Sequence, residues 1–233
     1  MDRRDFVKKL GLGAGYMVLL PTVSACTSTP AKDDAVPTDG PTQTDATMAN
    51  VPPLDRNGIP TARPVDWDPI AFNEKRGLAG AIPETYHASI TGEGGESKHL
   101  GKHLPYVPAM DAVAPVGFIP LMWGDPAKGH AKHPNAPANE SNNNEGHWYD
   151  WIRVGKVDGD SIDELQSTFK GWPDVVEGST GAYLTSDGGA ITDDSGKNTV
   201  YLVALPKSAK PGDTLRIYAH CLTHGEYVDF ITL

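Results

Sequence analysis

Thr214-Leu-Arg-Ile-Tyr-Ala219 and the run Tyr227 to Leu233 are the clearest strand signals in this chain. Both segments are short and rich in β-branched and aromatic residues, which is typical of β-strands. Between them lies Cys221-Leu-Thr-His224-Gly225, so a thiol and an imidazole come directly after a predicted strand. The C-terminal part of the chain is therefore predicted to be strand-forming and to carry side chains that can bind a metal.

Three further segments have the same strand-like character, and turn-forming residues separate the predicted elements. Asp187-Gly188-Gly189 and Asp194-Ser195-Gly196 are turn signals, and the polar segment 206–212 is predicted to connect two strands as a hairpin with a longer loop. Residues 160–169 are predicted as a short helix, and the body shows no long helical period. Short strands with frequent turns predict an all-β fold, a single immunoglobulin-like antiparallel β-sandwich. The three further predicted strands are 116–123, 148–154 and 199–205.

The N-terminus has the pattern of an export signal. Arg3-Arg4 precedes an apolar segment, 10–20, that is shorter than the roughly 20 residues of a membrane-spanning helix. A frayed amphipathic helix is the alternative interpretation. The segment ends in Val23-Ser24-Ala25-Cys26, which is the pattern of a bacterial lipoprotein cleavage site. Residues 1–25 are therefore predicted to be a twin-arginine lipoprotein signal peptide, with Cys26 as the lipid-bearing N-terminus.

This signal predicts a protein that is lipid-anchored on the periplasmic side of a bacterial membrane. Thr27 follows the cysteine, which by resemblance to Gram-negative lipoproteins favours the outer over the inner membrane. Residues 26–60 contain almost no large apolar side chain, so they are predicted to form a flexible, disordered tether. The folded domain is predicted to span residues 61–233.

The charge of the chain limits its partners. The formal net charge is −10, and removing residues 1–25 takes away four basic and two acidic side chains, which gives −12. This acidity argues against nucleic acid as a partner and against electrostatic attachment to anionic lipid. The lipid anchor is then the predicted contact with the membrane. Solubility and the docking of a basic redox partner are the two interpretations of the acidity.

The sequence contains two cysteines and eight histidines. Because Cys26 is predicted to carry lipid, Cys221 has no cysteine to pair with, although exported proteins usually pair their cysteines. One thiol and several imidazoles that meet in space would form a soft, redox-capable metal site. Four motifs carry the candidate ligands, in this order: Lys102-His103-Leu104-Pro105; His133-Pro134-Asn135; Glu145 and His147 before Trp151-Ile152; and Tyr218 before Cys221, His224 and Gly225.

Together the four motifs resemble the iron site of the superoxide reductase family, also called the desulfoferrodoxin or neelaredoxin family. The resemblance covers about residue 96 to the C-terminus. It implies one mononuclear non-haem iron centre, Fe(His)4Cys, that reduces superoxide by one electron to hydrogen peroxide. It also implies that His103, His133, His147 and His224 are equatorial ligands, that Cys221 is the axial ligand, and that the sixth position is open.

Lys102 is the catalytic residue that the resemblance implies. Its charge would attract the anion and help orient a proton-donating water, whereas a solvated surface lysine is the alternative. Many family members carry a glutamate two residues before the first histidine, where this chain has Gly101, and Glu93 and Glu96 are the candidates to replace it. The first ligand also has a competitor, because His99 lies in a similar Lys-His-Leu sequence.

The spacing between His133 and His147 is longer than is usual in the family. The extra segment, 136–144, is polar and rich in asparagine, and is predicted to be a loop insertion near the metal. The remaining histidines of interest are predicted to lie at the surface or beside the ligands, and they are His87, His130 and His220, the last of which precedes Cys221 directly.

Other kinds of metal protein also use a Cys-x-x-His motif. Blue-copper electron carriers place it on a β-sandwich, but a methionine or glutamine normally follows their last histidine, and neither follows His224. A periplasmic electron-transfer protein with copper or iron is the alternative function, and a metal-binding module without turnover or a zinc site are the others. No rubredoxin-like cysteine quartet is present, so a reductase of this sequence would need a separate electron donor, a cytochrome or a rubredoxin-like carrier. A homo-oligomer is also compatible with the sequence.

Overall fold

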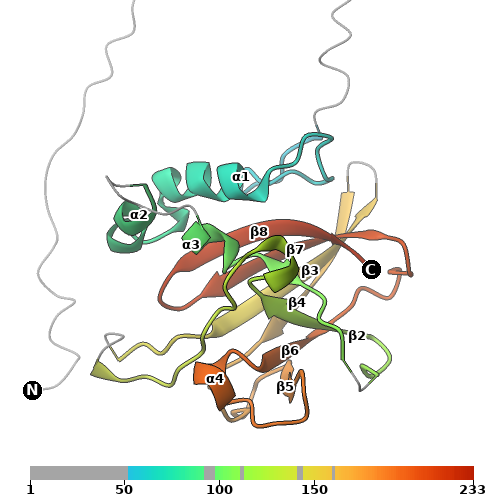
Figure 1. Ribbon diagram of the computed structural model, residues 1–233. Coiled ribbons are helices and arrows are strands. Elements are labelled where there is room, and N and C mark those ends of the chain that lie inside the picture. The colour runs from blue at the N-terminus through green and yellow to red at the C-terminus, as the bar shows by residue number, and fades with distance from the viewer. Residues whose placement is uncertain (1–51, 92–97, 111–112, 141–143, 159–160) are drawn as a thin grey trace, which may run out of the picture. The chain divides into compact units, whose positions relative to one another are not determined.

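A computed structural model describes residues 52–91, 98–110, 113–140, 144–158 and 161–233 (Figure 1). The predicted signal peptide, the lipidation site Cys26, residues 27–51 of the predicted tether, and Glu93 and Glu96 lie outside these described residues. Within the described ranges, no helix combines the length and the apolar character needed to cross a membrane.

Two four-stranded antiparallel sheets form the structure (Figure 1). The strand order in the first sheet is β1 (Pro105–Tyr106), β2 (Phe118–Trp123), β6 (Thr199–Ala204) and β5 (Ala182–Thr185). The order in the second sheet is β4 (Ser161–Thr168), β3 (Tyr149–Asp158), β7 (Thr214–Cys221) and β8 (Gly225–Thr232). The predicted all-β antiparallel sandwich is confirmed, and each of the five predicted strands is present with shifted ends.

The core lies between the two sheets and follows the two-residue period of the strands. In β7 every second side chain from Leu215 to Cys221 is buried in this core, together with side chains of β2, β3 and β6. The intervening Tyr218 belongs to a separate cluster on the outer face of the second sheet, beside Ile59 and Val228. The strand period therefore makes Cys221 the last inward-facing side chain of β7, at one end of the sandwich.

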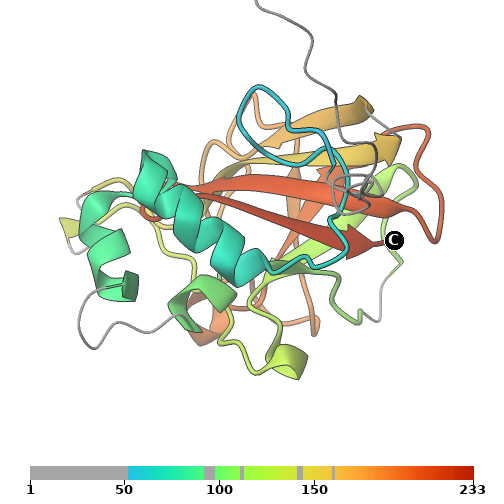
Figure 2. The ribbon, with the colours of Figure 1, turned by 90° about the horizontal axis from the view of Figure 1, so that it is seen from above.

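A helix from the N-terminal part covers the second sheet at β8 (Figure 2). Asp68 caps α1 (Pro69–Arg76), because its carboxylate accepts hydrogen bonds from two backbone N–H groups of the first turn. Asn73 joins α1 to β8: its amide donates to the carbonyl of Val228 at 2.7 Å, and its carbonyl accepts from the N–H of Val228 at 2.8 Å. Fully buried Asn73 thus takes the place of a further strand at this edge of the sheet.

The other helical segments among the described residues are also short. None exceeds eight residues, which is too short to produce a clear helical period in the sequence. They are the π-helical turn η1 (Gly77–Ala81), α2 (Glu84–Thr91), α3 (Lys98–Gly101), the 3-10 turn η2 (Pro126–Lys128) and α4 (Asp193–Gly196).

Two predictions of local structure are wrong. Residues 160–169 were predicted as a short helix, but 161–168 form β4, which pairs with β3 along its whole length. Exposed and half-buried side chains alternate along most of this strand, as expected at the edge of a sheet. The segment 206–212 is not a hairpin connector, because it links β6 of the first sheet to β7 of the second. Both strands bury one face in the same core from opposite sides, so the chain crosses between the sheets.

The packed part of the chain begins before the predicted domain boundary at residue 61. Ile59 is fully buried beside Tyr218 and Val228. The buried guanidinium of Arg216 forms an ion pair with Asp55 at 2.9 Å. Residues 55–59, which composition assigns to the tether, are therefore anchored on the outer face of the second sheet.

Replacing Asn73 by alanine is expected to lower the free energy of unfolding by about 2–4 kcal/mol. The substitution removes two buried hydrogen bonds and leaves the N–H and carbonyl of Val228 without partners. Chemical denaturation measures the change. Lys75→Ala, on the exposed face of the same helix, is the control and should change the value by less than about 0.5 kcal/mol. Equal stabilities of the two variants would contradict this role of Asn73.

Candidate metal centre

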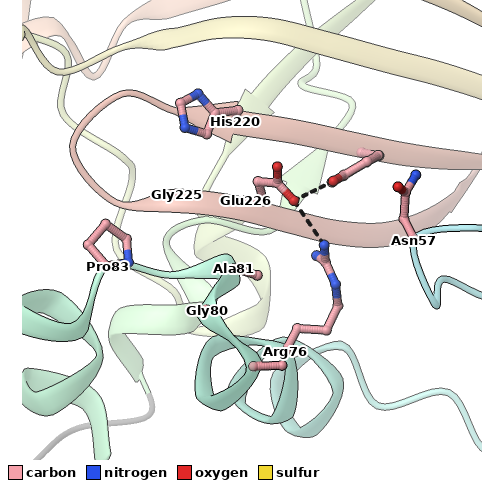
Figure 3. A pocket seen from close by; sticks show the side chains of 10 residues that line it. Asn57, Arg76, Gly80, Ala81, Pro83, His220, Gly225 and Glu226 are labelled. Atoms are coloured by element: carbon pink, nitrogen blue, oxygen red, sulfur yellow. Dashed lines mark hydrogen bonds and ion pairs between the residues drawn. The ribbon is translucent and has the colours of Figure 1, made fainter. Parts of the chain in front are cut away.

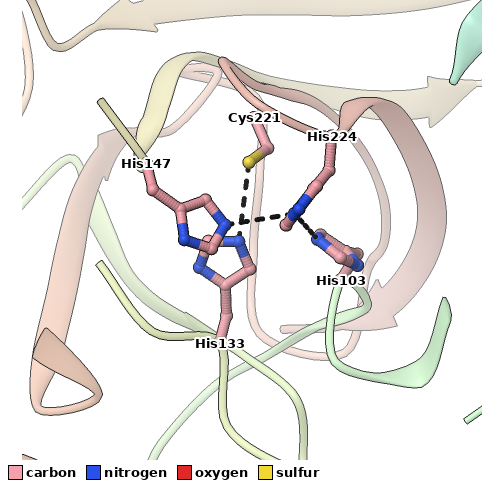
Figure 4. A group of neighbouring side chains, drawn as sticks. All are labelled: His103, His133, His147, Cys221 and His224. Atoms are coloured by element: carbon pink, nitrogen blue, oxygen red, sulfur yellow. Dashed lines mark hydrogen bonds between the residues drawn. The ribbon is translucent and has the colours of Figure 1, made fainter. Parts of the chain in front are cut away.

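Five side chains from separate parts of the chain converge at one end of the sandwich (Figure 4). They are His103, His133, His147, Cys221 and His224, the five candidate ligands of the sequence motifs. One ligand atom from each of these side chains lies within 4.8 Å of those of the others. Three of the side chains are buried and two are half-buried. The structure therefore brings all five residues together in a largely solvent-excluded space.

The tight turn between β7 and β8 places two of the five side chains. Cys221 pairs with Gly225 across the turn, and the N–H of His224 donates to the carbonyl of Cys221 at 3.2 Å. Gly225 has a positive φ of 84°, and a Cβ at this position would lie 2.3 Å from the carbonyl oxygen of Ala81. The hydroxyl of Tyr227 donates to the carbonyl of His224 at 2.8 Å. Glycine is therefore required where the turn is tightest, and the turn directs the thiol and the imidazole toward one point.

His103 follows α3 and is fully buried. Its ring stacks on Tyr227, with 4.3 Å between ring centroids and 9° between planes. Its Nδ1 lies 2.9 Å from the carbonyl oxygen of His99. Because a carbonyl can only accept, Nδ1 carries the hydrogen and Nε2 presents its lone pair to the cluster. The cluster thus contains the ring of His103 and not that of His99, which contributes its backbone carbonyl.

The other two imidazoles lie on either side of the segment 136–144. The N–H of His133 donates to the carbonyl of Trp123 at the end of β2, at 3.0 Å, and its Nε2 lies 3.6 Å from the sulfur of the cluster. His147 and Ala136 are joined by two backbone hydrogen bonds of 2.8 and 3.0 Å. The bridge therefore joins the first residue of the predicted insertion, 136–144, to His147, and it holds His147 beside the cluster whatever the length of the intervening segment.

The inward-facing nitrogens lie close together, and they cannot all find hydrogen-bond partners among themselves. Nδ1 of His224 is 3.0 Å from Nε2 of His103 and 3.1 Å from Nε2 of His147. A neutral imidazole has one hydrogen, so His224 can donate to at most one of these two nitrogens. A metal ion among them would accept all the lone pairs at once. Four imidazoles and one thiol are a donor set that fits a transition-metal ion.

Burial keeps the imidazoles neutral and the thiol protonated. Loss of solvation lowers the pKa of His103 and of His133 well below the usual value, and it lowers the pKa of His147 to about 4 and that of His224 to about 2. The same effect raises the pKa of the Cys221 thiol to about 12. At pH 7 the four rings can act as ligands at once, whereas the thiol must lose its proton to a metal ion.

Lys102 lies beside the cluster and is half-buried. Its ammonium is 5.5 Å from the ring centroid of Tyr86, and Tyr86 in turn stacks on His224, with 3.8 Å between centroids and 22° between planes. Burial lowers the pKa of Lys102, and the nearby Cys221 acts in the opposite direction. The ammonium is thus within electrostatic reach of the thiol.

Tyr86 is a neighbour of the cluster that sequence reasoning missed. It lies in α2, upstream of the first of the four motifs, and it belongs to none of them. The signal in the sequence was weak: Tyr86 and Ile90 are one helical turn apart, which places both on one face of a short helix. This face packs in a cluster with Tyr227 and Leu100.

His130 fills the space in front of Gly101, two residues before His103. A Cβ on Gly101 would lie 2.1 Å from Nδ1 of His130. A side chain at residue 101 would therefore require the ring of His130 to move. His130 therefore lies next to the chain that leads into His103.

The other residues singled out in the sequence lie outside the cluster. Glu145 is exposed. His220, although it precedes Cys221, forms an ion pair with Asp150 at 2.6 Å and stacks with Trp151. His87 is buried, with 9% of its surface exposed, so a surface position for this residue is wrong. Its ring lies against Gly77, where α1 gives way to η1, which explains its burial.

A cavity of about 540 Å³ lies on the outer face of the β7–β8 hairpin (Figure 3). Glu226 accepts hydrogen bonds there from Arg76, at 3.0 Å, and from the hydroxyl of Tyr218. His220 and Gly225 also line the cavity, but no member of the five-residue cluster does. The cavity and the cluster are thus on different sides of the hairpin.

No protein-family model, curated protein or solved structure matches this chain. The four motifs and the geometry of the cluster are therefore the observations from which its function can be argued.

Loading the metal-free protein with Zn²⁺ at pH 7 is expected to release about one proton per ion. The proton comes from the Cys221 thiol, whose pKa burial raises to about 12, because the histidines are already neutral. Since the metal-bound state holds fewer protons, affinity should rise about tenfold per pH unit between pH 5 and 9. Calorimetry in buffers with different ionisation enthalpies counts the protons. Cys221→Ser should release none, and a wild-type value of zero would exclude the thiol as a ligand.

Proposed function

We propose that this protein is a superoxide reductase with one mononuclear iron held by His103, His133, His147, Cys221 and His224. The convergence of four neutral imidazoles and one thiol within 4.8 Å carries the proposal. Iron bound there would supply one electron to superoxide, which takes up two protons and leaves as hydrogen peroxide. The order of the four motifs along the chain supports the same assignment.

The donor set favours iron over the other candidate ions. Imidazole nitrogens suit ferrous iron, and a thiolate ligand donates electron density to the metal. Structural zinc sites almost always have four ligands, whereas five are available here. A blue-copper site normally has a weak axial methionine or glutamine, and residues 225–233 contain neither. The chain therefore offers ligands that suit an iron centre and lacks the usual axial ligand of a copper carrier.

Lys102 supplies a positive charge beside the position proposed for superoxide. Its ammonium is half-buried over Tyr86, so solvent screens its field less than that of a fully exposed lysine. The charge of Lys102 also contributes to the low pKa of His103 and of His147, which supports its closeness to the ligands. In the proposed reaction it attracts superoxide and stabilises the negative charge that grows on the reacting oxygens.

The proposed reaction needs an electron donor and a cellular location. We infer that the signal-like residues 1–25 and Cys26 make this a lipid-anchored protein of the periplasm. Superoxide is an anion and crosses membranes poorly, so a periplasmic reductase would protect that compartment. Cys221 belongs to the proposed iron site, and Cys26 is the only other cysteine, so the chain has no cysteine quartet that could hold a second iron. Electrons would therefore come from a separate cytochrome or rubredoxin-like carrier.

Protein made through its native export pathway is expected to contain about one iron per chain and to consume superoxide when a reductant is supplied. Cys221→Ser should remove the sulfur-to-iron charge-transfer absorption and slow superoxide consumption by at least about 100-fold, because the thiolate is the electron-rich ligand. Metal analysis, visible spectroscopy and pulse radiolysis measure these quantities. One copper per chain with a reversible potential and no superoxide consumption would instead support an electron-transfer protein.

Lys102→Ala is expected to slow the reaction with superoxide by about tenfold at low ionic strength, with a smaller difference at high salt. Lys102→Arg keeps the charge and should retain most of the rate. Lys75→Ala removes an equal charge from the exposed face of α1 and serves as the control. The second-order rate constant is measured as a function of ionic strength. A rate for Lys102→Ala equal to that of the control would remove the proposed role.

A further inference from the structure

Tyr86 brings a phenol from α2 to the side of the cluster formed by His103 and His224. Its ring stacks face to face on His224 at 3.8 Å and meets the ring of His103 edge-on at 5.5 Å. Lys102 lies over the same ring. One aromatic side chain thus touches two of the proposed ligands and the proposed catalytic lysine.

The hydroxyl of Tyr86 is buried and has no hydrogen-bond partner among the described residues. Buried hydroxyls are almost always hydrogen-bonded, and an exception calls for an explanation. The hydroxyl of the neighbouring Tyr227 follows the rule, because it donates to the carbonyl of His224 at 2.8 Å. Tyr86 therefore holds a spare O–H donor close to the cluster, while Tyr227 holds none.

Two observations support a role for this donor at the cluster. The ring that carries this hydroxyl lies 3.8 Å from the ring of His224, between centroids, and its centroid is 5.5 Å from the ammonium of Lys102, so the donor is beside both the cluster and the positive charge. Residue 101 cannot supply a polar group to this region, because it is a glycine whose open side is filled by His130.

We propose that Tyr86 is a substrate-binding residue, whose O–H donates a hydrogen bond to a small oxygen or nitrogen anion bound at the metal centre. This rests on the proposed function, because it assigns the donor to the same site. Lys102 supplies the charge that attracts the anion, and Tyr86 supplies the directed hydrogen bond that fixes its orientation. The stacking on His224 holds the phenol in place, so little side-chain freedom is lost when the anion binds.

The test uses the full chain loaded with Co²⁺, whose visible bands change when an anion joins the metal. Azide is the probe, and its dissociation constant is measured for the wild type, Tyr86→Phe and Tyr86→Leu. Tyr86→Phe keeps the stacked ring and removes the O–H alone. It is expected to bind azide about tenfold more weakly or worse, because a hydrogen bond to a charged group is lost. Its Co²⁺ affinity should stay within about twofold of the wild-type value, and its thermal midpoint within about 3 °C. Differences of this size are typical of ordinary surface substitutions.

Tyr106→Phe is the matched control, because Tyr106 in β1 is a half-buried tyrosine whose hydroxyl bonds to Met122 and not to the cluster. Unchanged azide affinity in Tyr86→Phe would overturn the inference. A loss seen only in Tyr86→Leu would also overturn it, since the ring would then act by packing. Failure of wild-type Co²⁺ protein to bind azide would do the same. Superoxide consumption by the iron form is measured separately, so a protein that binds azide through Tyr86 without consuming superoxide would refute the proposed function alone.

Discussion

Four imidazole nitrogens and one sulfur, held within 4.8 Å in a largely dry space, are the constraint on which this end of the molecule depends. Each ring is kept neutral by burial, so each presents a lone pair, and one hydrogen on His224 cannot satisfy both close neighbours. Such an arrangement is unfavourable for the protein alone and becomes favourable when a cation joins it. The free energy of metal binding and the stability of this end of the sandwich are therefore coupled.

The turn between β7 and β8 connects the five-residue cluster to the rest of the fold. The two-residue period of β7 carries Cys221 into the core, and the three-residue step to His224 returns the chain toward the same point. The step works because Gly225 accepts a positive φ in a space that leaves no room for a Cβ. Both sheets contribute the remaining ligands at the ends of strands or in the loops beside them, where a rigid framework holds side chains that the core does not need.

The sequence predicts the parts of the structure that depend on short-range pattern or on side-chain chemistry. Strands such as 199–205 and 214–219 are recognisable because their β-branched and aromatic residues suit a pleated, buried surface. The ligands are recognisable because thiol and imidazole are uncommon and occur in ordered motifs. Tyr86 carries no such chemistry, and its role depends on a stacking contact across 138 residues, counted from residue 86 to 224. Residues 160–169 were misjudged because pairing with β3 decides their conformation, and a single sequence does not contain that partner.

The N-terminal segment makes contacts that the motifs alone do not imply. It meets the second sheet through the ion pair of Asp55 with Arg216 and through the two hydrogen bonds of Asn73 to β8. It meets the hairpin turn where Ala81 approaches Gly225, and the cluster where Tyr86 stacks on His224. Without this segment, the turn between β7 and β8 would be open to water. Water weakens the electrostatic interactions between the side chains of the turn and a bound ion. Because Ala81 approaches Gly225 with its backbone carbonyl and not with a flexible side chain, a shift of the segment would move the turn. The geometry of Cys221 and His224 is thus coupled to the docking of residues 55–86, a segment that contributes no member of the five-residue cluster itself.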